Sequence, residues 1–225
     1  MQVSSENLPI EVYSVKTEYN LIEKVIKRFV DILGAICGII LLIPVTIVVF
    51  FINLFKGGKS KIFFKQKRIG KNGKLFEIYK FQTMIPNADE YLKEYLSKNE
   101  EAKIEYKKYK KLKNDPRVTP VGNFLRKTSL DEFPQFINVL IGNMTLVGPR
   151  PYLPREIDDM GEYYNYIIKC TPGITGPWQV SGRSNTNFED RLKIDKEYYE
   201  NISLKNDALI LFKTVKNLLN KTGAL

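Results

Sequence analysis

The sequence predicts a mostly helical α/β (α+β) protein, in which one membrane helix is joined to a small cytoplasmic domain with a short β-hairpin. Three observations support this prediction: an apolar run without charges at residues 32–55, two apolar clusters separated by a Gly-Lys-Asn-Gly turn, and repeated apolar residues at helical spacing farther along the chain. We therefore expect an N-terminal arm over residues 1–22, an interfacial or reentrant membrane helix over residues 23–56, and a folded domain over residues 57–225.

The amino-acid composition excludes several kinds of catalytic site and metal site. It has 225 residues and a net charge of +10, from 35 Lys and Arg against 25 Asp and Glu, which suits nucleic acid, an acidic membrane surface or a phosphorylated substrate as partner. The absence of histidine excludes Ser-His-Asp and Cys-His catalysis and histidine metal sites, and two cysteines are too few for a structural zinc site. Catalytic groups must come mainly from carboxylates, Lys, Tyr or hydroxyls, and a bound metal would be a hard cation held by oxygen atoms.

The apolar run at residues 32–55 is long enough to enter a membrane, because about 20 apolar residues span a bilayer. Pro44 lies near its centre, where it removes a backbone hydrogen bond and costs about 3 kcal/mol unless the kink is useful. Basic residues flank both ends, so the positive-inside rule is satisfied if both ends stay in the cytoplasm. We favour a kinked reentrant helix, with a kinked span or a soluble core helix as alternatives. Asp31, at the entrance, is expected to be interfacial rather than buried.

The following segment predicts a hairpin and then a long helix. Apolar clusters at residues 62–64 and 75–79 flank the turn at residues 70–73. The basic surface of this hairpin suits anionic head groups, with a solvated loop as the alternative. Residues 87–113 alternate acids and bases with Tyr and Leu at helical spacing, which predicts one long exposed helix. Its adjacent carboxylates Asp89 and Glu90 are typical of helix capping and solvation.

A second carboxylate pair, Asp131 and Glu132, precedes apolar residues at helical spacing, which predicts a single buried helical face. The members of this face are Phe133, Phe136, Ile137, Leu140 and Ile141. The carboxylates would lie at the helix start, where the helix dipole favours negative charge. Capping alone would explain them, either as a capping box from Ser129 to Glu132 or with Asp131 as the cap before Pro134. The spacing by itself leaves capping and catalysis both open.

Gly and Pro mark tight loops at residues 148–151, 171–176 and 181–183. Each loop brings backbone amides or an Arg side chain, among them Arg150 and Arg183, into a rigid turn that suits phosphate binding. A plain structural turn is the simpler interpretation of any one loop taken alone.

Five motifs in order resemble those of the monotopic polyprenyl-phosphate phosphoglycosyl transferases, a family of bacterial sugar transferases. The resemblance covers residues 24–225 and rests on KRFVDILGAICGIILLIP, IYKFQTM, TSLDEFPQFINVLIGNMTLVGPRP, TPGITGPWQVSGR and DKEYYENISLKNDALI. It implies a reentrant helix broken at a Ser-Pro pair. That pair is Ile43-Pro44 here, so Pro44 keeps the proline kink while the serine is missing.

The resemblance also implies the roles of individual residues. The family's Asp-Glu dyad matches Asp131 and Glu132, with Asp131 as nucleophile, Glu132 as its orienting or metal-binding partner, and both near a Mg²⁺ cofactor. The residues that match the family's phosphate contacts are Lys80, Arg126, Arg150 and Arg183. Gln82 stands where a basic residue is common in the family, so less anion binding is expected at that position.

The reaction implied by the resemblance transfers a hexose 1-phosphate from a UDP-sugar to undecaprenyl phosphate and releases UMP. The motifs are most similar to the galactose and glucose phosphotransferases, so UDP-galactose or UDP-glucose is the expected donor and an N-acetylated amino sugar is the alternative. This would be the first membrane step of exopolysaccharide, capsule or O-antigen synthesis. The resemblance places the catalytic domain on the cytoplasmic side of the inner membrane, with membrane lipids and downstream glycosyltransferases as partners.

Two other classes of function fit parts of the sequence. A basic, membrane-anchored nucleic-acid-binding module would use the Lys-rich surface and the tyrosines, and its binding would survive Asp131→Asn. A non-catalytic scaffold for polysaccharide assembly would leave Asp131, Glu132 and the arginines dispensable. Their joint presence favours the enzyme, and we expect no nucleic-acid partner.

Overall fold

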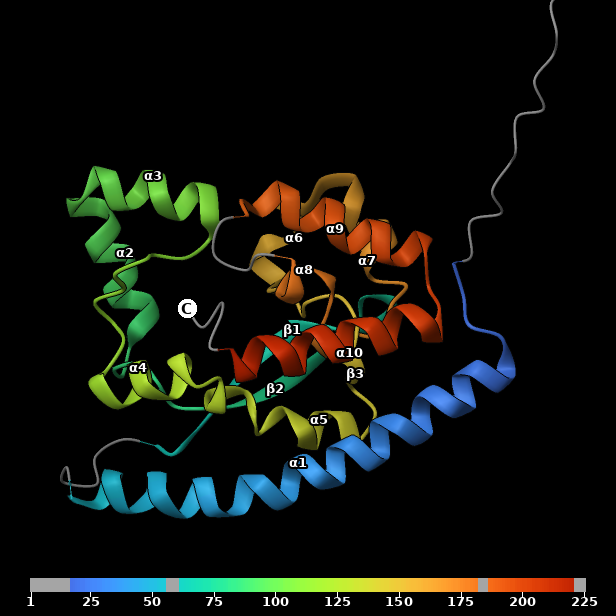
Figure 1. Cartoon of the computed structure of the whole chain (residues 1–225). Helices are drawn as coiled ribbons and strands as arrows, with labels where there is room; N and C mark the ends of the chain where they lie inside the picture. The colour runs from blue at the N-terminus through green and yellow to red at the C-terminus, as the bar shows by residue number, and fades with distance from the viewer. Residues whose placement is uncertain (1–16, 56–60, 182–185, 221–225) are drawn as a thin grey trace, which may run out of the picture.

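The computed structural model describes residues 17–55, 61–181 and 186–220, so most of the predicted N-terminal arm lies outside the described residues. Figure 1 shows a mostly helical protein with a small antiparallel hairpin, as expected. The helices are α1 (Leu21–Phe55), α2 (Ala88–Lys98), α3 (Glu100–Tyr109), α4 (Pro120–Lys127), α5 (Gln135–Leu140), α6 (Ile157–Met160), α7 (Tyr164–Ile167), α8 (Pro177–Val180), α9 (Phe188–Glu200) and α10 (Leu204–Leu219). The strands are β1 (Phe63–Ile69), β2 (Leu75–Phe81), β3 (Thr145–Val147) and β4 (Gly173–Thr175), and the 3-10 turns are η1 (Lys71–Gly73), η2 (Leu130–Glu132), η3 (Pro154–Glu156) and η4 (Gly161–Tyr163).

Strands β1 and β2 form the hairpin that the sequence predicts. They pair antiparallel, from Phe63 opposite Phe81 to Ile69 opposite Leu75. In the turn, Asn72 has a φ of 56° and Gly73 a φ of 75°. Gly and Asn tolerate this left-handed backbone better than other residues, which explains why the Gly-Lys-Asn-Gly sequence marks the turn.

A second sheet was not predicted. Strands β3 and β4 pair in parallel, with Thr145 opposite Gly173 and Val147 opposite Thr175. The pairing continues into the loops that follow, because the Gly148 amide donates to the Thr175 carbonyl at 3.0 Å and the Gly173 amide to the Pro149 carbonyl at 2.9 Å. Two of the predicted Gly-Pro loops are therefore held side by side.

Helix α1 remains α-helical from Leu21 to Phe55, with Pro44 inside it. Near the proline, the Thr46 hydroxyl donates to the Leu42 carbonyl at 2.8 Å, an arrangement that often bends helices. Figure 1 shows α1 as one long helix along one side of the domain. It is long and apolar enough to cross a membrane, and this property indicates membrane association. The break expected at Pro44, and with it the re-entry, is not confirmed.

The start of α1 is joined to the domain by buried polar contacts. Asp31 is only 5% exposed, so the expectation of an interfacial Asp31 was wrong. Its carboxylate accepts hydrogen bonds from the Thr145 hydroxyl at 2.8 and 2.9 Å and from the Leu146 amide at 2.8 Å. These partners satisfy the charge, and burying it becomes tolerable. Lys27 donates to the Val147 carbonyl at 2.9 Å and pairs with Asp207 at 2.7 Å.

The helix expected over residues 87–113 is two helices, α2 and α3. Asn99 separates them with an extended backbone, at φ −135° and ψ 100°, and its side chain accepts from the Ala102 amide at 3.0 Å. Asn competes with the helix through such local hydrogen bonds, and helical periodicity does not reveal this break. The two helices pack on each other around a small cluster of Leu92, Ala102 and Leu112.

Candidate active site

The carboxylate pair Asp131 and Glu132 lies in the 3-10 turn η2, between α4 and α5. Ser129 precedes the turn in the left-handed conformation, with a φ of 57°, and its side chain makes no capping hydrogen bond. Helix α5 begins only at Gln135, after Pro134. Both capping interpretations were therefore wrong, and capping does not explain these acids.

Only part of the predicted apolar face is covered, because Phe133 and Phe136 are half-buried and its other members are exposed. Gln135, Asn138 and Val139 are buried, whereas Ile137, Leu140 and Ile141 are exposed. The reason is that the core lies on the β2 side of α5, where the Asn138 side chain accepts from the Tyr79 amide at 3.0 Å and donates to the Glu77 carbonyl at 2.7 Å. Asn138 thus ties α5 to the strand that carries Lys80.

Lys80 and Glu132 form an ion pair across the site. The Lys80 Nζ lies 2.7 Å from Glu132 Oε1, and the two side chains are 20% and 34% exposed. The pair joins the end of β2 to η2, so two predicted site residues from distant parts of the sequence are in contact. Arg126, on α4, is held near them because its Nε donates to the Thr83 hydroxyl at 3.0 Å.

Asp131 lies deeper than Glu132 and is only 9% exposed. Burial raises its pKa from 3.8 to about 6, with Glu132 acting in the same direction and with Lys80 and Arg126 opposing the change. Burial lowers the pKa of Arg126, although the negative charge of Asp131 opposes this. A carboxylate with a pKa near 6 is about 90% ionised at neutral pH and is more basic than an exposed one, and both properties suit a nucleophile.

Arg150 lies in the loop after β3. Its guanidinium carbon is 5.4 Å from the centre of the Trp178 ring. The Arg68 Nη1 donates to the Pro151 carbonyl at 3.0 Å; burial and the positive charge of Arg150 lower the pKa of Arg68, whereas Glu156 and Glu132 oppose this. Arg183, the last predicted phosphate contact, lies outside the described residues.

The sequence interpretation missed several groups beneath the Arg150 loop. Asp195 on α9 accepts from the Tyr152 hydroxyl at 2.8 Å and from the Arg150 amide at 3.4 Å, so it supports this loop. Burial raises the pKa of Asp195 from 3.8 to about 7. Arg191 lies one helical turn before Asp195 and stacks 4.2 Å from the Trp178 ring centre. The spacing of Arg191 and Asp195 was a signal that could have drawn attention to this face of α9.

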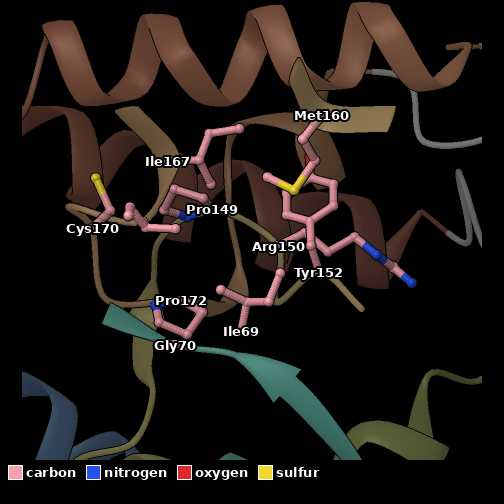
Figure 2. A pocket seen from close by; sticks show the side chains of 10 residues that line it. Ile69, Gly70, Pro149, Arg150, Tyr152, Met160, Ile167, Cys170 and Pro172 are labelled. Carbon is pink, nitrogen blue, oxygen red and sulfur yellow. The ribbon is translucent and has the colours of Figure 1, made fainter. Parts of the chain in front are cut away.

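A small cavity lies behind the Arg150 loop, and Figure 2 shows its lining. Ile69, Tyr152, Met160 and Ile167 make most of it apolar. In Figure 2 the Arg150 side chain points away from the other lining residues. The cavity therefore offers few polar partners to a ligand, and Asp131 and Glu132 do not line it.

The carboxylate pair fits one kind of metal site. No cluster of three or more Cys, Asp or Glu in the described part of the chain could hold a metal ion by itself. Mg²⁺ commonly uses one or two carboxylates and takes its remaining ligands from water and substrate phosphates. The oxygen donors of Asp131 and Glu132 match this pattern, provided that a phosphorylated substrate completes the site.

Comparison with known proteins identifies the family to which the chain belongs. The family model of bacterial sugar transferases matches residues 22–221, which include α1, the carboxylate pair and the Arg150 loop. The chain belongs to the bacterial sugar transferase family. The resemblance noted in its motifs is thereby confirmed.

Individual members of the sugar transferase family are similar over most of the chain. A Haemophilus influenzae protein named as an uncharacterized sugar transferase is 46% identical over 91% of this chain and 43% of its own length. The undecaprenyl-phosphate galactose phosphotransferase of Salmonella typhimurium is 42% identical over 95% of this chain and 45% of its own length. The exopolysaccharide production protein ExoY of Sinorhizobium fredii is 41% identical over 88% of this chain and 87% of its own length. The chain thus spans less than half the length of the first two relatives and most of the third.

Proposed function

We propose that this sugar transferase moves a hexose 1-phosphate from a UDP-sugar to undecaprenyl phosphate, with Asp131 as nucleophile. The observation that carries the proposal is the buried Asp131 carboxylate, which has a pKa of about 6 and lies beside Glu132, Lys80 and Arg126. The name of the Salmonella relative, an undecaprenyl-phosphate galactose phosphotransferase, supports this reaction and makes galactose the first donor sugar to test. The name of the Sinorhizobium relative supports a place in exopolysaccharide production.

The proposed reaction has two displacements. A carboxylate oxygen of Asp131 attacks the sugar-linked phosphorus, the bond from that phosphorus to the bridging oxygen breaks, and UMP leaves with the bond electrons. An oxygen of the polyprenyl phosphate then attacks the same phosphorus and expels the Asp131 carboxylate. The products are UMP and a polyprenyl diphosphate sugar, and the enzyme returns to its starting state.

The cations around Asp131 would reduce the repulsion between its carboxylate and the diphosphate of the donor. A carboxylate and a diphosphate repel each other by about 4 kcal/mol per pair of charges 4 Å apart at an effective dielectric of 20. Lys80 and Arg126 lie at the carboxylates and lower this repulsion, and Arg150 and Arg183 would bind phosphate oxygens farther along the donor. Asp131 and Glu132 would hold Mg²⁺, which when bound would neutralise diphosphate charge.

Helix α1 supplies the membrane side of the proposal. Its exposed apolar residues suit contact with lipid, and we propose that it enters the cytoplasmic leaflet of the inner membrane and keeps both ends in the cytoplasm. Its buried residues pack on the catalytic domain from Asp31 to Val49, an arrangement that suits a helix at the membrane surface. The site would then lie at the height where a polyprenyl phosphate leaves the bilayer.

The first test is release of UMP from a panel of UDP-sugars, with Mg²⁺ and undecaprenyl phosphate in detergent. Wild type and Asp89→Asn should release UMP, while Asp131→Asn should not. Asp89 is a matched control, because it is an exposed first-turn acid paired with Arg155 at 3.3 Å. If no donor gives UMP with folded wild type, the transferase proposal is wrong and the scaffold gains support. An N-acetylated amino sugar as the best donor would replace the hexose.

A second measurement tests the covalent step. Without undecaprenyl phosphate, incubation with the preferred donor should increase the mass of the intact protein by one sugar phosphate. Peptide mapping should place this mass on the segment that contains Asp131. An active wild-type enzyme that never carries the added mass under rapid quenching would instead indicate direct transfer between the two substrates.

A further inference from the structure

The side-chain amide of Asn138 takes the place of a third strand beside the β1–β2 hairpin. Its Oδ1 accepts from the Tyr79 amide at 3.0 Å, and its Nδ2 donates to the Glu77 carbonyl at 2.7 Å. In an antiparallel pair, every second residue turns its backbone N–H and C=O away from the partner strand, so Glu77 and Tyr79 present these groups on the edge of β2 opposite β1. Asn138 is 0% exposed, so its amide is directed at β2 and not at water.

Asn138 belongs to the same hydrogen-bonded segment as the two carboxylates of the candidate site. Backbone hydrogen bonds continue from η2 into α5, because the Phe133 amide donates to the Leu130 carbonyl at 3.1 Å and the Phe136 amide to the Phe133 carbonyl at 3.0 Å. A shift of α5 along β2 would therefore carry the carboxylates of η2 with it.

Helix α1 holds the other end of α5. The guanidinium group of Arg28 donates to the Val139 carbonyl at 2.7 Å and to the Leu140 carbonyl at 2.8 Å, both in the last turn of α5. Figure 1 shows α5 between α1 and the hairpin. Arg28 thus fixes α5 against α1, and Asn138 fixes β2 against α5.

The contact between Lys80 and Glu132 depends on this arrangement. Lys80 directly follows Tyr79 in β2, and its Nζ lies 2.7 Å from Glu132 Oε1. One partner is therefore placed by the hydrogen bonds of Asn138 to β2, and the other by the segment that contains Asn138. A change in the position of β2 along α5 would change the distance between the ammonium group and the carboxylates.

Apolar packing alone would not fix this position. Ile78 and Val139, the chain neighbours of the bonded groups, pack in an apolar cluster with Ala35 and Met144. An apolar side chain at position 138 would also suit these surroundings, but apolar contacts have no direction and would let β2 slide. A buried amide costs free energy unless it is paired, and the two hydrogen bonds of Asn138 specify one position of the strand.

We propose that Asn138 is a positioning residue of the transferase: its side-chain amide fixes β2 along α5, so that Lys80 stays in contact with Glu132 beside Asp131. This inference rests on the proposed function, which makes Lys80 part of the reacting site. Asn138 itself touches neither substrate and acts through Lys80.

The test is a double-variant cycle on UMP release at saturating donor, with the full chain in detergent. Asn138→Leu, which nearly keeps the size of the side chain and removes both hydrogen bonds, should lower kcat about tenfold, because Lys80 is displaced. Lys80→Met should lower kcat about 100-fold, and the double variant should also stay at about 100-fold, because Asn138 then has no cation left to position. Independent effects would multiply to about 1000-fold.

The matched control is Asn99→Leu, which removes a side-chain hydrogen bond to the Ala102 amide at the start of α3 and should leave kcat within about twofold of wild type. The inference is overturned by a double variant slowed about 1000-fold, by an Asn138→Leu protein with the kcat of wild type, or by an Asn99→Leu protein that is slowed equally.

A second variant covers the case in which Asn138→Leu does not fold. Asn138→Ser then replaces it in the same cycle, since its smaller side chain leaves room for water at the two backbone groups of β2. If neither variant folds, Asn138 holds the fold as a whole, and the specific role in positioning Lys80 is excluded.

A cycle on stability separates this inference from the proposed function, because it needs no substrate. In chemical denaturation, Lys80→Met and Glu132→Gln should show a coupling of about threefold in the unfolding equilibrium constant, typical of a partly exposed ion pair, and Asn138→Ser should abolish it. A coupling that is absent from wild type, or that survives in Asn138→Ser, overturns the inference. If that happens while wild type releases UMP, only this inference fails. If no donor gives UMP but Asn138→Ser abolishes the coupling, the positioning role stands and the proposed reaction fails.

Discussion

Replacing Asp131 with Asn is expected to stabilise the folded protein near neutral pH, although it removes the proposed nucleophile. Burial raises the pKa of Asp131 from 3.8 to about 6, so the folded state binds a proton at this carboxyl group more tightly than the unfolded state does. The neutral form therefore favours folding, and this contribution is lost as the pH rises from below 3.8 through about 6. Asn has nearly the same shape and stays neutral at every pH.

The pKa values set the size of the effect. The difference between 3.8 and about 6 corresponds to about 3 kcal/mol of destabilisation by the ionised carboxylate at neutral pH. For a protein of this length, such a change raises the Tm by roughly 6–12 °C. The difference between variant and wild type should shrink below about pH 6 and disappear below about pH 4, where both side chains are neutral.

Unfolding in detergent, followed by Trp178 fluorescence at several pH values, measures this difference. Asp115→Asn is the matched control, with the opposite expected sign. Burial alone would raise the pKa of Asp115, but hydrogen bonds from Arg117 outweigh it and lower the pKa, so the ionised form stabilises the fold. An Asp131→Asn protein less stable than wild type at neutral pH would refute the reasoning. So would a gain in stability that persists unchanged at about pH 4.

Three further outcomes follow from the site and its support. UMP release should fall about tenfold for each pH unit below about 6, because the attack needs ionised Asp131, and a flat rate down to about pH 5 would contradict this. Lys80→Met should lower the rate of UMP release about 100-fold, because it removes the cation paired with Glu132 at 2.7 Å. A rate within about twofold of wild type would exclude an electrostatic role of Lys80 in the reaction. Gly38→Leu should lower the free energy of unfolding by about 2 kcal/mol, because a Cβ at Gly38 would lie 2.3 Å from the Phe136 ring. Chemical denaturation measures this loss, with Ile36→Leu at an exposed position of the same helix as the control.

Local sequence rules predicted the elements in which local and tertiary preferences agree. The hairpin was found because Asn72 and Gly73 accept the left-handed turn that joins two apolar strands. The length and apolar character of α1 were equally clear. Strands β3 and β4 have three residues each, too few to show an alternating pattern, and only their parallel pairing defines them.

The failures arose where tertiary contacts decide the environment of a residue. Asp31 resembles an interfacial charge in the sequence, yet Thr145 and the Leu146 amide, more than a hundred residues away, satisfy it in the interior. The apolar period of α5 predicted one buried face, yet Ile137, Leu140 and Ile141 of that face are exposed, because Asn138 directs the other face to β2. Periodicity records which residues share a face and not which neighbour covers that face.

The candidate site also contains residues that the sequence predicted and residues that it did not. Family motifs identified Asp131, Glu132, Lys80, Arg126 and Arg150 as candidates, and the structure brings the first four together. Arg191 escaped notice because its spacing from Asp195 shows only that the two residues share a face of α9, and not which residue that face meets. Its contact with Trp178 depends on how α8 and α9 pack.

Helix α1 supplies part of the hydrophobic core of the catalytic domain. Ala35 packs with Ile78 and Val139, and Leu42 and Val49 belong to the cluster that contains Phe81. A fragment trimmed to begin after Phe55 would expose these surfaces to water and lose the Asp31 carboxylate, the buried partner of Thr145 and the Leu146 amide. Removing the membrane helix therefore does not yield a soluble enzyme, and detergents chosen to preserve this fold must shield the outer side of α1 without competing for its inner side.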